Sequence, residues 1–387
     1  MKTLNTKNQT IYVFIVLFFC FYTSNAQRYL TNQFTQVDST VNIIYGNAND
    51  YLGNSQPLKL DFYQPNGDVV LKRPLIIYIH GGGFTSGTRK YLHIKNIISR
   101  MVLKGYTAAS IDYRLDPTFQ LYNSTTNRRA MTDAMHDAKA AIRYFKANAN
   151  TYGIDTNQII IGGESAGAIT SMMAAYVDKQ SEMTVYPMAN PNNPIGTSGN
   201  AGYSNKVKAT LCLCGLILDT TAIEFQDKPM LVVHGTSDTF IPLVFAQNIV
   251  KRNLNTSTTF TNYFFNGATH CPWITTLPNY TQYEDSTVNL ITNFLYSQIQ
   301  TSIKSIINKT NGLKIYPNPS NGDVFIENET NNNIKFKVID VLGEEIISNS
   351  IASSDIFKLR IDKLKAGIYI IQSIQNNIIQ NQKLIVK

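Results

Sequence analysis

The sequence has few of the cysteines and histidines that build metal centres, and it has no long run of the basic residues that bind nucleic acids. Its 387 residues include four cysteines and five histidines, and none of them shows the spacing of a zinc site. The formal net charge is +8, yet consecutive basic residues occur only in pairs, such as Arg128–Arg129. Charge spread so thinly indicates a solvated surface and argues against a nucleic-acid partner.

A permanent membrane span is not expected either. The N-terminal segment carries an apolar run, Ile11–Tyr22, which is too short to cross a bilayer comfortably. Lys2 and Lys7 precede this run, and Ser24–Ala26 follows it with small residues at the usual cleavage spacing. We therefore predict that residues 1–26 are a signal peptide and that the mature protein is secreted or held at the cell surface.

Removal of the signal peptide leaves an odd number of cysteines. Without Cys20 the mature chain holds Cys212, Cys214 and Cys271, so at least one thiol is free or forms an intermolecular bond. Cys212 and Cys214 lie two residues apart and would share one face of a strand. We interpret both as small buried hydrophobic residues, and the sequence gives Cys271 no role beyond filling space.

Short apolar runs alternate with helical patterns from about Tyr45 to Gln300. The predicted strands are Pro74–His80, Gly105–Asp112, Gln158–Gly163, Lys208–Ile217, Pro229–His234 and Thr261–Gly267. Most are apolar nearly throughout, which is typical of strands buried on both faces, and Met131–Ala149 repeats its apolar residues at helical spacing. The pattern predicts an α/β fold with a mostly parallel sheet, whose ligands collect at the carboxyl ends of the strands.

One segment, Tyr186–Lys206, breaks this alternation. It is rich in proline, asparagine and glycine and has no apolar periodicity. A long loop in a compact domain is usually functional or mobile. We interpret it either as a lid or pocket wall or as a plain surface insertion.

The stretch Ile159–Ser171 places a serine between glycines at the end of a predicted strand. Gly163–Gly167 has the form G-x-S-x-G, and a helix-like run follows it. Such a turn holds the serine in a strained backbone conformation and exposes its hydroxyl, and larger residues at the glycine positions would crowd it. Ser165 is therefore predicted to be a nucleophile, whereas packing filler is the alternative.

A serine hydroxyl needs a base to take its proton. In hydrolases with this turn the order along the chain is serine, acid, histidine. Three of the five histidines precede the serine and are excluded: His80, His93 and His136. His234 ends a strand and precedes a glycine, so we interpret it as structural. His270, directly after the last predicted strand of this region, is left as the base.

The acid is expected between Ser165 and His270. Asp238 lies in the loop beyond Pro229–His234, where it can accept the Nδ1 proton of His270, fix its tautomer and stabilise the imidazolium. Asp219, which also follows a strand, is the alternative.

Donors for a developing oxyanion are also present. The backbone N–H of Ala166 lies at the start of the predicted helix, and three glycines follow a strand in the motif HGGGF. Glycine amides can turn toward one point because no Cβ blocks the approach. We predict that Gly82, Gly83 and Ala166 form the oxyanion hole, and Gly81 stays open as a further donor.

Five motifs in this order resemble the secreted carboxylesterase/lipase group of the α/β-hydrolase superfamily: HGGGF, DYRL, GGESAGA, HGTSDTFIP and GATH. The resemblance covers roughly Tyr45 to Gln300. It implies an α/β-hydrolase fold and ester hydrolysis through an acyl-serine, with neither a metal nor an organic cofactor. The region is shorter than the large carboxylesterases that carry GESAGA, and polyester hydrolases and cutinases usually lack HGGGF. Phe84 and Trp273 are predicted to help bind the substrate.

The tail, Leu313–Lys387, consists of short, Ile-rich, alternating runs and contains neither histidine nor cysteine. This pattern predicts a small antiparallel β-sandwich without catalytic residues. The stretches LKIYPNPSNGDVFIE, VIDVLGEEI, IDKLKAGIYII and KLIVK resemble a type IX secretion C-terminal sorting domain. The resemblance implies the type IX secretion machinery as a partner. A carbohydrate- or partner-binding sandwich is the alternative, which Tyr316 and Tyr369 keep open.

Together these features predict an exported serine ester hydrolase that acts on a small-molecule or polymer-borne ester. The predicted order is signal peptide 1–26, α/β-hydrolase domain 27–300, linker 301–312 and sorting domain 313–387. Acyl or feruloyl esters of polysaccharides, lipid esters and small aryl esters all remain open as substrates. The alternatives are a serine peptidase of the prolyl-oligopeptidase type, although no gating domain is evident, and a non-catalytic surface protein on a hydrolase fold.

Overall fold

The computed structural model describes the chain from residue 28 in nine ranges: 28–120, 124–185, 193–274, 280–310, 313–328, 332–340, 345–362, 364–375 and 378–387. The chain divides into two compact units, Met1–Gln298 and Ile299–Lys387. The predicted signal peptide, residues 1–26, lies outside the described residues. Within the described ranges, no helix combines the length and the apolar character that a membrane crossing requires.

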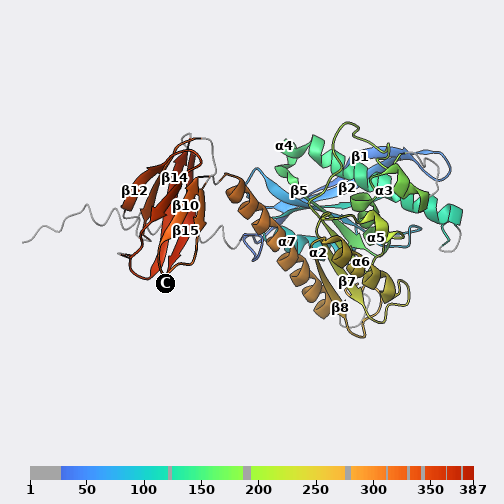
Figure 1. The fold of residues 1–387 in the computed structure, drawn as a ribbon. Coiled ribbons are helices and arrows are strands. Elements are labelled where there is room, and N and C mark those ends of the chain that lie inside the picture. Colours follow the sequence, from blue (N-terminus) through green and yellow to red (C-terminus); the bar gives the residue numbers. More distant parts are fainter. Residues whose placement is uncertain are drawn as a thin grey trace, which may run out of the picture. The chain divides into compact units, whose positions relative to one another are not determined.

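The first unit is built on an eight-stranded sheet with the order β1-β2-β4-β3-β5-β6-β7-β8 (Figure 1). Its strands are β1 (Val37–Asn49), β2 (Ser55–Pro65), β3 (Arg73–Ile79), β4 (Thr107–Ile111), β5 (Ile154–Glu164), β6 (Ala209–Leu213), β7 (Met230–Gly235) and β8 (Phe260–Phe265). β1 and β2 pair antiparallel, as do β2 and β4, and the remaining neighbours are parallel. The predicted α/β fold with a mostly parallel sheet is thus confirmed.

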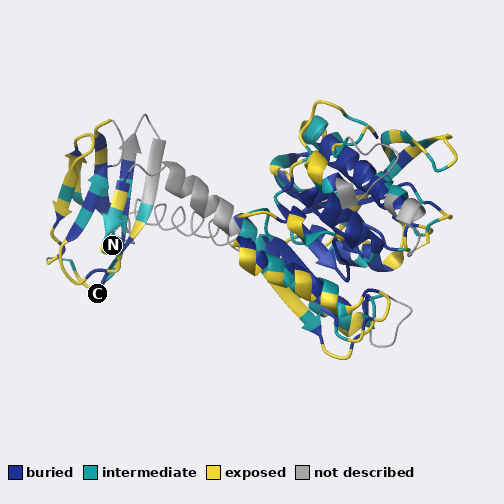
Figure 2. Ribbon diagram, turned by 45° about the vertical axis from the view of Figure 1, so that its right-hand side comes forward, coloured by how far each residue is buried: buried dark blue, intermediate teal, exposed yellow. Residues whose placement is uncertain are grey.

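Six strands of this sheet were predicted, and two were not. β3, β4, β6 and β7 are buried at every position (Figure 2), which explains their nearly continuous apolar sequences. β1 forms the edge of the sheet and exposes most of its side chains. Its sequence therefore lacks the apolar run that marked the other strands.

Helices cover both faces of the sheet. They are α2 (Leu92–Val102), α3 (Ser124–Ala147), α4 (Ala149–Tyr152), α5 (Ala166–Tyr176), α6 (Leu243–Thr256) and α7 (Tyr280–Thr310), with two short 3-10 turns at Gln180–Val185 and Thr220–Ala222. Ile77 and Ile79 of β3 pack in one core cluster with α3 and α5. Tyr78, between them, points to the other face, where α2 contacts α7 through an ion pair of Arg100 and Asp285 (2.7 Å).

Helix α7 extends through most of the segment for which we expected a linker. It continues to Thr310, and so covers residues 301–310 of the expected linker 301–312, whose last two residues lie outside the described part. The cause lies in its sequence, since Tyr280–Thr310 contains neither glycine nor proline to end the helix. The first such residue is Gly312.

The second unit contains two antiparallel sheets, as predicted for the tail. The three-stranded sheet has the order β13-β10-β9, and the four-stranded sheet has the order β12-β11-β14-β15. Their strands are β9 (Leu313–Tyr316), β10 (Val324–Asn328), β11 (Ile334–Ile339), β12 (Glu345–Ile351), β13 (Ile356–Leu359), β14 (Gly367–Gln375) and β15 (Ile378–Val386). Apolar residues from both sheets, among them Val324, Val338 and Leu384, share one buried core.

Candidate active site

Ser165 lies in a tight turn between β5 and α5, at the carboxyl end of a central strand. Its φ of 52° and ψ of −122° belong to a region that non-glycine residues rarely occupy. Its backbone N–H donates to the carbonyl of Leu213 in β6 (3.0 Å), and its carbonyl accepts the N–H of Ile169 in α5 (3.0 Å). Hydrogen bonds on both sides therefore hold the serine in this strained conformation.

Packing explains why glycines flank this turn. A Cβ on Gly163 would lie 2.3 Å from the carbonyl oxygen of Ile79. A Cβ on Gly167 would lie 2.1 Å from the same oxygen and 2.6 Å from the carbonyl oxygen of His80. The backbone at the end of β3 thus passes too close to the turn for any side chain at either position.

The structure brings His270 and Asp238 into one hydrogen-bonded chain with Ser165. Nε2 of His270 lies 2.8 Å from Oγ of Ser165, and Nδ1 of His270 lies 2.7 Å from Oδ2 of Asp238. The three residues follow the parallel strands β5, β7 and β8, whose carboxyl ends meet at one edge of the sheet. Asp219, the alternative acid, instead accepts the backbone N–H and the hydroxyl of Thr221 at 2.8 and 2.7 Å.

The loop around Asp238 holds its side chain as a carboxylate. Burial alone would raise the pKa of Asp238, but hydrogen bonds from His234, His270 and the backbone N–H of Ile241 outweigh it and hold the pKa well below its ordinary value. The N–H groups of Phe240 and Ile241 both donate to Oδ1 at 2.9 Å. Nε2 of His234 lies 2.7 Å from the Ile241 carbonyl oxygen and 3.3 Å from Oδ2 of Asp238. His234 thus supports the acid loop, in agreement with its structural interpretation.

The predicted oxyanion donors lie beside the serine. Gly81, Gly82, Gly83 and Ala166 all line the same cavity as Ser165. Ala166 is the first residue of α5, so its N–H has no acceptor within the helix. Gly82 and Gly83 have φ values of 121° and 61°, and a Cβ on Gly82 would lie 2.0 Å from the carbonyl oxygen of Ser86. Both positions therefore favour glycine over any other residue.

The cavity at Ser165 has a volume of about 1030 Å³ and a mainly apolar wall. Loops after β3, β6, β7 and β8 contribute to it, together with residues of α3, α5 and α6. Its apolar side chains include Phe84, Phe119, Met131, Ile169, Leu216, Phe240 and Phe245. Such a cavity can enclose a ligand with a substantial apolar portion.

The two predicted substrate contacts lie in different surroundings. Phe84 lines the cavity, and its ring centroid lies 5.3 Å from that of Phe119. Trp273, contrary to our expectation, is fully buried and is not part of the cavity lining. Phe240, which the sequence analysis did not single out, is 76% exposed and lies with its ring centroid 5.4 Å from that of His270. Of these three aromatic side chains, Phe240 is the one exposed to solvent.

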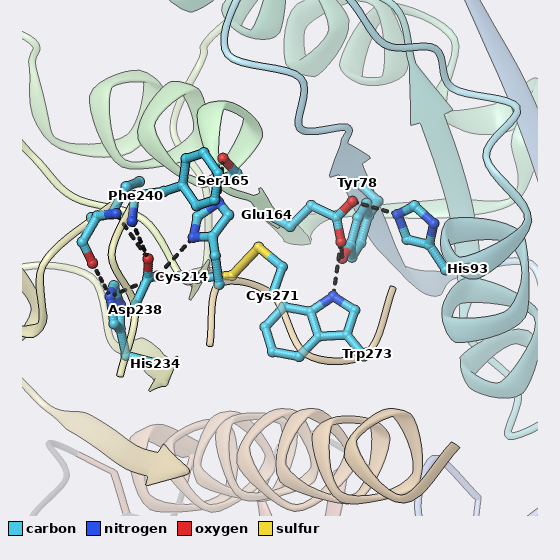
Figure 3. The surroundings of a disulfide bond; sticks show 12 residues. Tyr78, His93, Glu164, Ser165, Cys214, His234, Asp238, Phe240, Cys271 and Trp273 are labelled. Atoms are coloured by element: carbon cyan, nitrogen blue, oxygen red, sulfur yellow. Dashed lines mark hydrogen bonds and ion pairs between the residues drawn. A yellow bond between two sulfur atoms is a disulfide. The ribbon is translucent and has the colours of Figure 1, made fainter. Parts of the chain in front are cut away.

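Glu164, next to the nucleophile, is a buried carboxylate that sequence reasoning missed. Its oxygens accept the hydroxyl of Tyr78 (3.2 Å) and the indole N–H of Trp273 (2.8 Å), and Nε2 of His93 lies 2.5 Å from Oε1 (Figure 3). Burial would raise the pKa of Glu164, but these hydrogen bonds and the charge of His93 lower it below its ordinary value. The carboxylate therefore ties the nucleophile turn to β3, to α2 and to the loop of His270.

A disulfide between Cys214 and Cys271 corrects our interpretation of both residues (Figure 3). Their separation of 57 residues gave no sign of contact, and Cys214 could not be told apart from Cys212 by its neighbours. Among the cysteines of the described ranges, Cys212 is left as a free thiol, and its complete burial raises its pKa to about 12. The sulfurs of Cys214 and Cys271 lie close to His270, but in a disulfide they offer no thiolate to a metal ion.

The described part of the Tyr186–Lys206 segment is anchored on α3 and does not form a lid. Three side chains on one face of that helix meet backbone carbonyls of the segment: His136 that of Asn193 (2.9 Å), Lys139 that of Pro194 (2.6 Å), and Arg143 those of Ile195 (2.8 Å) and Gly199 (2.9 Å). No residue of 193–206 lines the cavity at Ser165. Residues 186–192 lie outside the described part.

Comparison with known proteins identifies two regions of the chain. Residues 60–211 match the BD-FAE family, and residues 314–387 match the secretion system C-terminal sorting domain. Esterase LipC of Mycobacterium tuberculosis is 24% identical over 224 residues, which are 52% of this chain and 53% of that protein. The probable carboxylic ester hydrolase LipM of the same organism is 26% identical over 189 residues, 49% of this chain and 36% of that protein. The chain thus spans about half the length of LipC and less of LipM.

Among solved structures, Thermogutta terrifontis esterase 2 has the same fold. Its form phosphorylated by paraoxon has a TM-score of 0.54 at 19% identity, and its apo form has a TM-score of 0.55 at 20% identity. Each comparison covers 67% of this chain and 94% of the esterase. A C-terminal sorting domain of this kind directs a protein to the cell surface or out of the cell. The chain therefore has an α/β-hydrolase fold in which residues 60–211 resemble the BD-FAE family, followed by a region, residues 314–387, that matches the secretion system C-terminal sorting domain.

Proposed function

We propose that this protein is a serine carboxylic-ester hydrolase with Ser165 as nucleophile, His270 as base and Asp238 as its orienting acid. The hydrogen-bonded chain of these three residues is the observation that carries the proposal. Its position in an apolar cavity beside Gly82, Gly83 and Ala166 supports the same conclusion.

In the proposed reaction, Nε2 of His270 takes the proton of Ser165 while Oγ attacks the ester carbonyl. The backbone N–H groups of Gly82, Gly83 and Ala166 stabilise the oxyanion. His270 then gives its proton to the leaving alcohol, and an acyl-serine remains. The same histidine deprotonates a water molecule that releases the acid. Asp238, ionised because its hydrogen bonds lower its pKa, stabilises the imidazolium in both halves.

The proposed organisation is a signal peptide at residues 1–26, a catalytic domain at 27–300, a linker at 301–312 and a sorting domain at 313–387. The proposed partners are the ester substrate and the type IX secretion machinery. Acyl or feruloyl esters of polysaccharides, small aryl esters and lipid esters are the proposed substrate classes. The apolar cavity of about 1030 Å³ favours esters with a substantial apolar group.

Ester hydrolysis by the purified protein tests the proposal. We expect turnover of acetyl, butyryl, long-chain and feruloyl esters to differ, and turnover of each to fall by about three orders of magnitude or more in Ser165→Ala. Amide cleavage at comparable efficiency would favour a peptidase. If the wild-type protein hydrolyses none of the four esters, the result would favour a non-catalytic surface protein.

A further inference from the structure

We propose that the Cys214–Cys271 disulfide positions His270 against Ser165, so that hydrolysis is fast only after these two thiols have been oxidised. The inference rests on the proposed function and adds a condition to the same site. It assigns the disulfide a role in catalysis that goes beyond holding the fold together. The residues concerned act through His270 and are positioning residues.

The disulfide closes a short path between the base and the nucleophile. Cys271 directly follows His270. Cys214 directly follows Leu213, whose carbonyl accepts the backbone N–H of Ser165 at 3.0 Å. The path closes where Nε2 of His270 lies 2.8 Å from Oγ of Ser165. Any shift of Cys271 relative to β6 therefore changes the geometry of this hydrogen bond.

Apart from the disulfide, hydrogen bonds hold the His270 loop before and after the histidine. On one side the N–H of Ser237 donates to the carbonyl of Ala268 (2.9 Å), and on the other the indole of Trp273 donates to Glu164 (2.8 Å). These contacts tie the loop to the acid loop and to β5. The disulfide adds a covalent tie to the end of β6, the strand that holds the amide of Ser165.

Both half-cystines have a backbone conformation that depends on their surroundings. Cys214 has a φ of 45° and Cys271 a φ of 43°, in a region where non-glycine residues persist only if neighbouring structure holds them. Once the sulfur–sulfur bond is absent, Cys271 can return to a negative φ. That rotation moves the chain directly after His270, and an error of 1 Å in placing a catalytic group can cost about 100-fold in rate.

Formation of the disulfide removes two electrons and two protons from the two thiols. A disulfide-bearing oxidant, such as oxidised glutathione or a disulfide oxidoreductase, accepts them and becomes two thiols. Disulfides persist in the compartments outside the cytoplasm, and the sorting domain marks this protein for export. The reduced chain is thus a slow hydrolase, and the exported chain is a fast one.

The test compares full-length wild type with the double variant Cys214→Ala/Cys271→Ala on one 4-nitrophenyl ester. We expect kcat to fall at least about 10-fold while KM stays within about twofold, since Cys271 alone of the two lines the cavity and alanine keeps its Cβ there. The rate at which a fluorophosphonate labels Ser165 should fall in parallel with kcat. A double variant that is folded by circular dichroism and keeps the wild-type kcat would overturn the proposal.

Cys212→Ala is the matched control, because it removes a buried thiol outside the disulfide. It should keep wild-type kcat and KM even where its melting temperature falls. The Cys212→Ala protein, kept reduced from expression onward, should have a low kcat. Treatment with oxidised glutathione should raise this kcat to the value of the disulfide-bonded protein. This second comparison decides the question if the double variant does not fold. Equal kcat before and after oxidation, with the disulfide verified by mass spectrometry, would contradict the proposal.

Ser165→Ala, assayed alongside, separates the two claims. If Ser165→Ala is inactive while the disulfide variant is as fast as wild type, the positioning role is wrong and the proposed function stands. If Ser165→Ala keeps the wild-type rate, the proposed function itself fails.

Discussion

At the scale of single residues, the candidate site depends on backbone that passes closely behind the nucleophile. Ser165 has a positive φ, and the carbonyl oxygen of Ile79 occupies the space that a side chain at Gly163 or Gly167 would need. The strain of the turn is thus imposed by its neighbours, which favours a rigid nucleophile.

Gly167→Ala should destabilise the first unit severely. Its Cβ would lie 2.1 Å from a backbone oxygen, and backbone cannot move aside as a flexible side chain can. We expect a loss of about 3 kcal/mol or more in the free energy of unfolding, measured by urea denaturation. Gly322→Ala is the control, because a Cβ there meets no atom within 4 Å. Equal stabilities of the two variants would show that the turn is looser than described.

Asp238→Asn should lower kcat by about four orders of magnitude and change how stability depends on pH. The folded protein lowers the pKa of Asp238, so the carboxylate stabilises the fold above the unfolded value of about 4. That contribution disappears as the pH falls through the folded pKa. Urea unfolding of both proteins should therefore give a stability difference that is largest near neutral pH and shrinks below about pH 4. A difference independent of pH would contradict this account.

The sequence predicted which polar side chains meet at the strand ends but not which buried ones surround them. His270 and Asp238 could be singled out because the chain holds few histidines and because parallel strands end at one edge. Glu164, His93 and the disulfide carry no pattern of their own, because their contacts join residues far apart in sequence. For the same reason, nothing indicated that the indole of Trp273 points toward Glu164.

At the scale of elements, α3 determines the course of the segment that follows α5. His136, Lys139 and Arg143 are spaced along one face of the helix and bind successive carbonyls of residues 193–199. The sequence of this segment, rich in proline and asparagine, showed only that it is irregular. Its attachment depends on polar side chains of a distant helix, which no periodicity of the segment itself could reveal.

Arg143→Met should destabilise the fold without changing catalysis. Arg143 is 1% exposed, and its loss leaves the carbonyls of Ile195 and Gly199 without these donors. We expect a loss of about 3 kcal/mol in the free energy of unfolding and an unchanged KM. Lys146→Met is the control, because the contact of Lys146 with the Lys206 carbonyl is exposed; it should change stability by less than about 0.5 kcal/mol. A raised KM in Arg143→Met would restore the lid interpretation.

At the scale of the whole molecule, the candidate active site and the sorting domain lie in separate units of the chain. The cavity at Ser165 is lined by residues between Gly81 and Ile274, all within the first unit. The sorting domain matches residues 314–387 in the second. The sequence predicted an α/β region followed by a small all-β region because the apolar patterns of the two differ.

Deletion of Leu313–Lys387 should leave kcat/KM within about twofold of wild type, because none of the described residues of the second unit lines the cavity. In a host with type IX secretion the truncated protein should accumulate in the periplasm, as cell fractionation would show. Ser165→Ala in the full chain, exported normally but inactive, provides the reciprocal control. Normal export of the truncated protein would contradict the role of the sorting domain.

The most direct test of the central claim is the mass-spectrometric identification of the residue that a fluorophosphonate modifies in the full-length protein. The account predicts a single adduct on the peptide that contains Ser165. It also predicts labelling slower by about three orders of magnitude in His270→Ala, because the hydroxyl then lacks its base. An adduct on another residue, or an unchanged labelling rate in His270→Ala, would contradict the assignment of Ser165 and His270 as nucleophile and base.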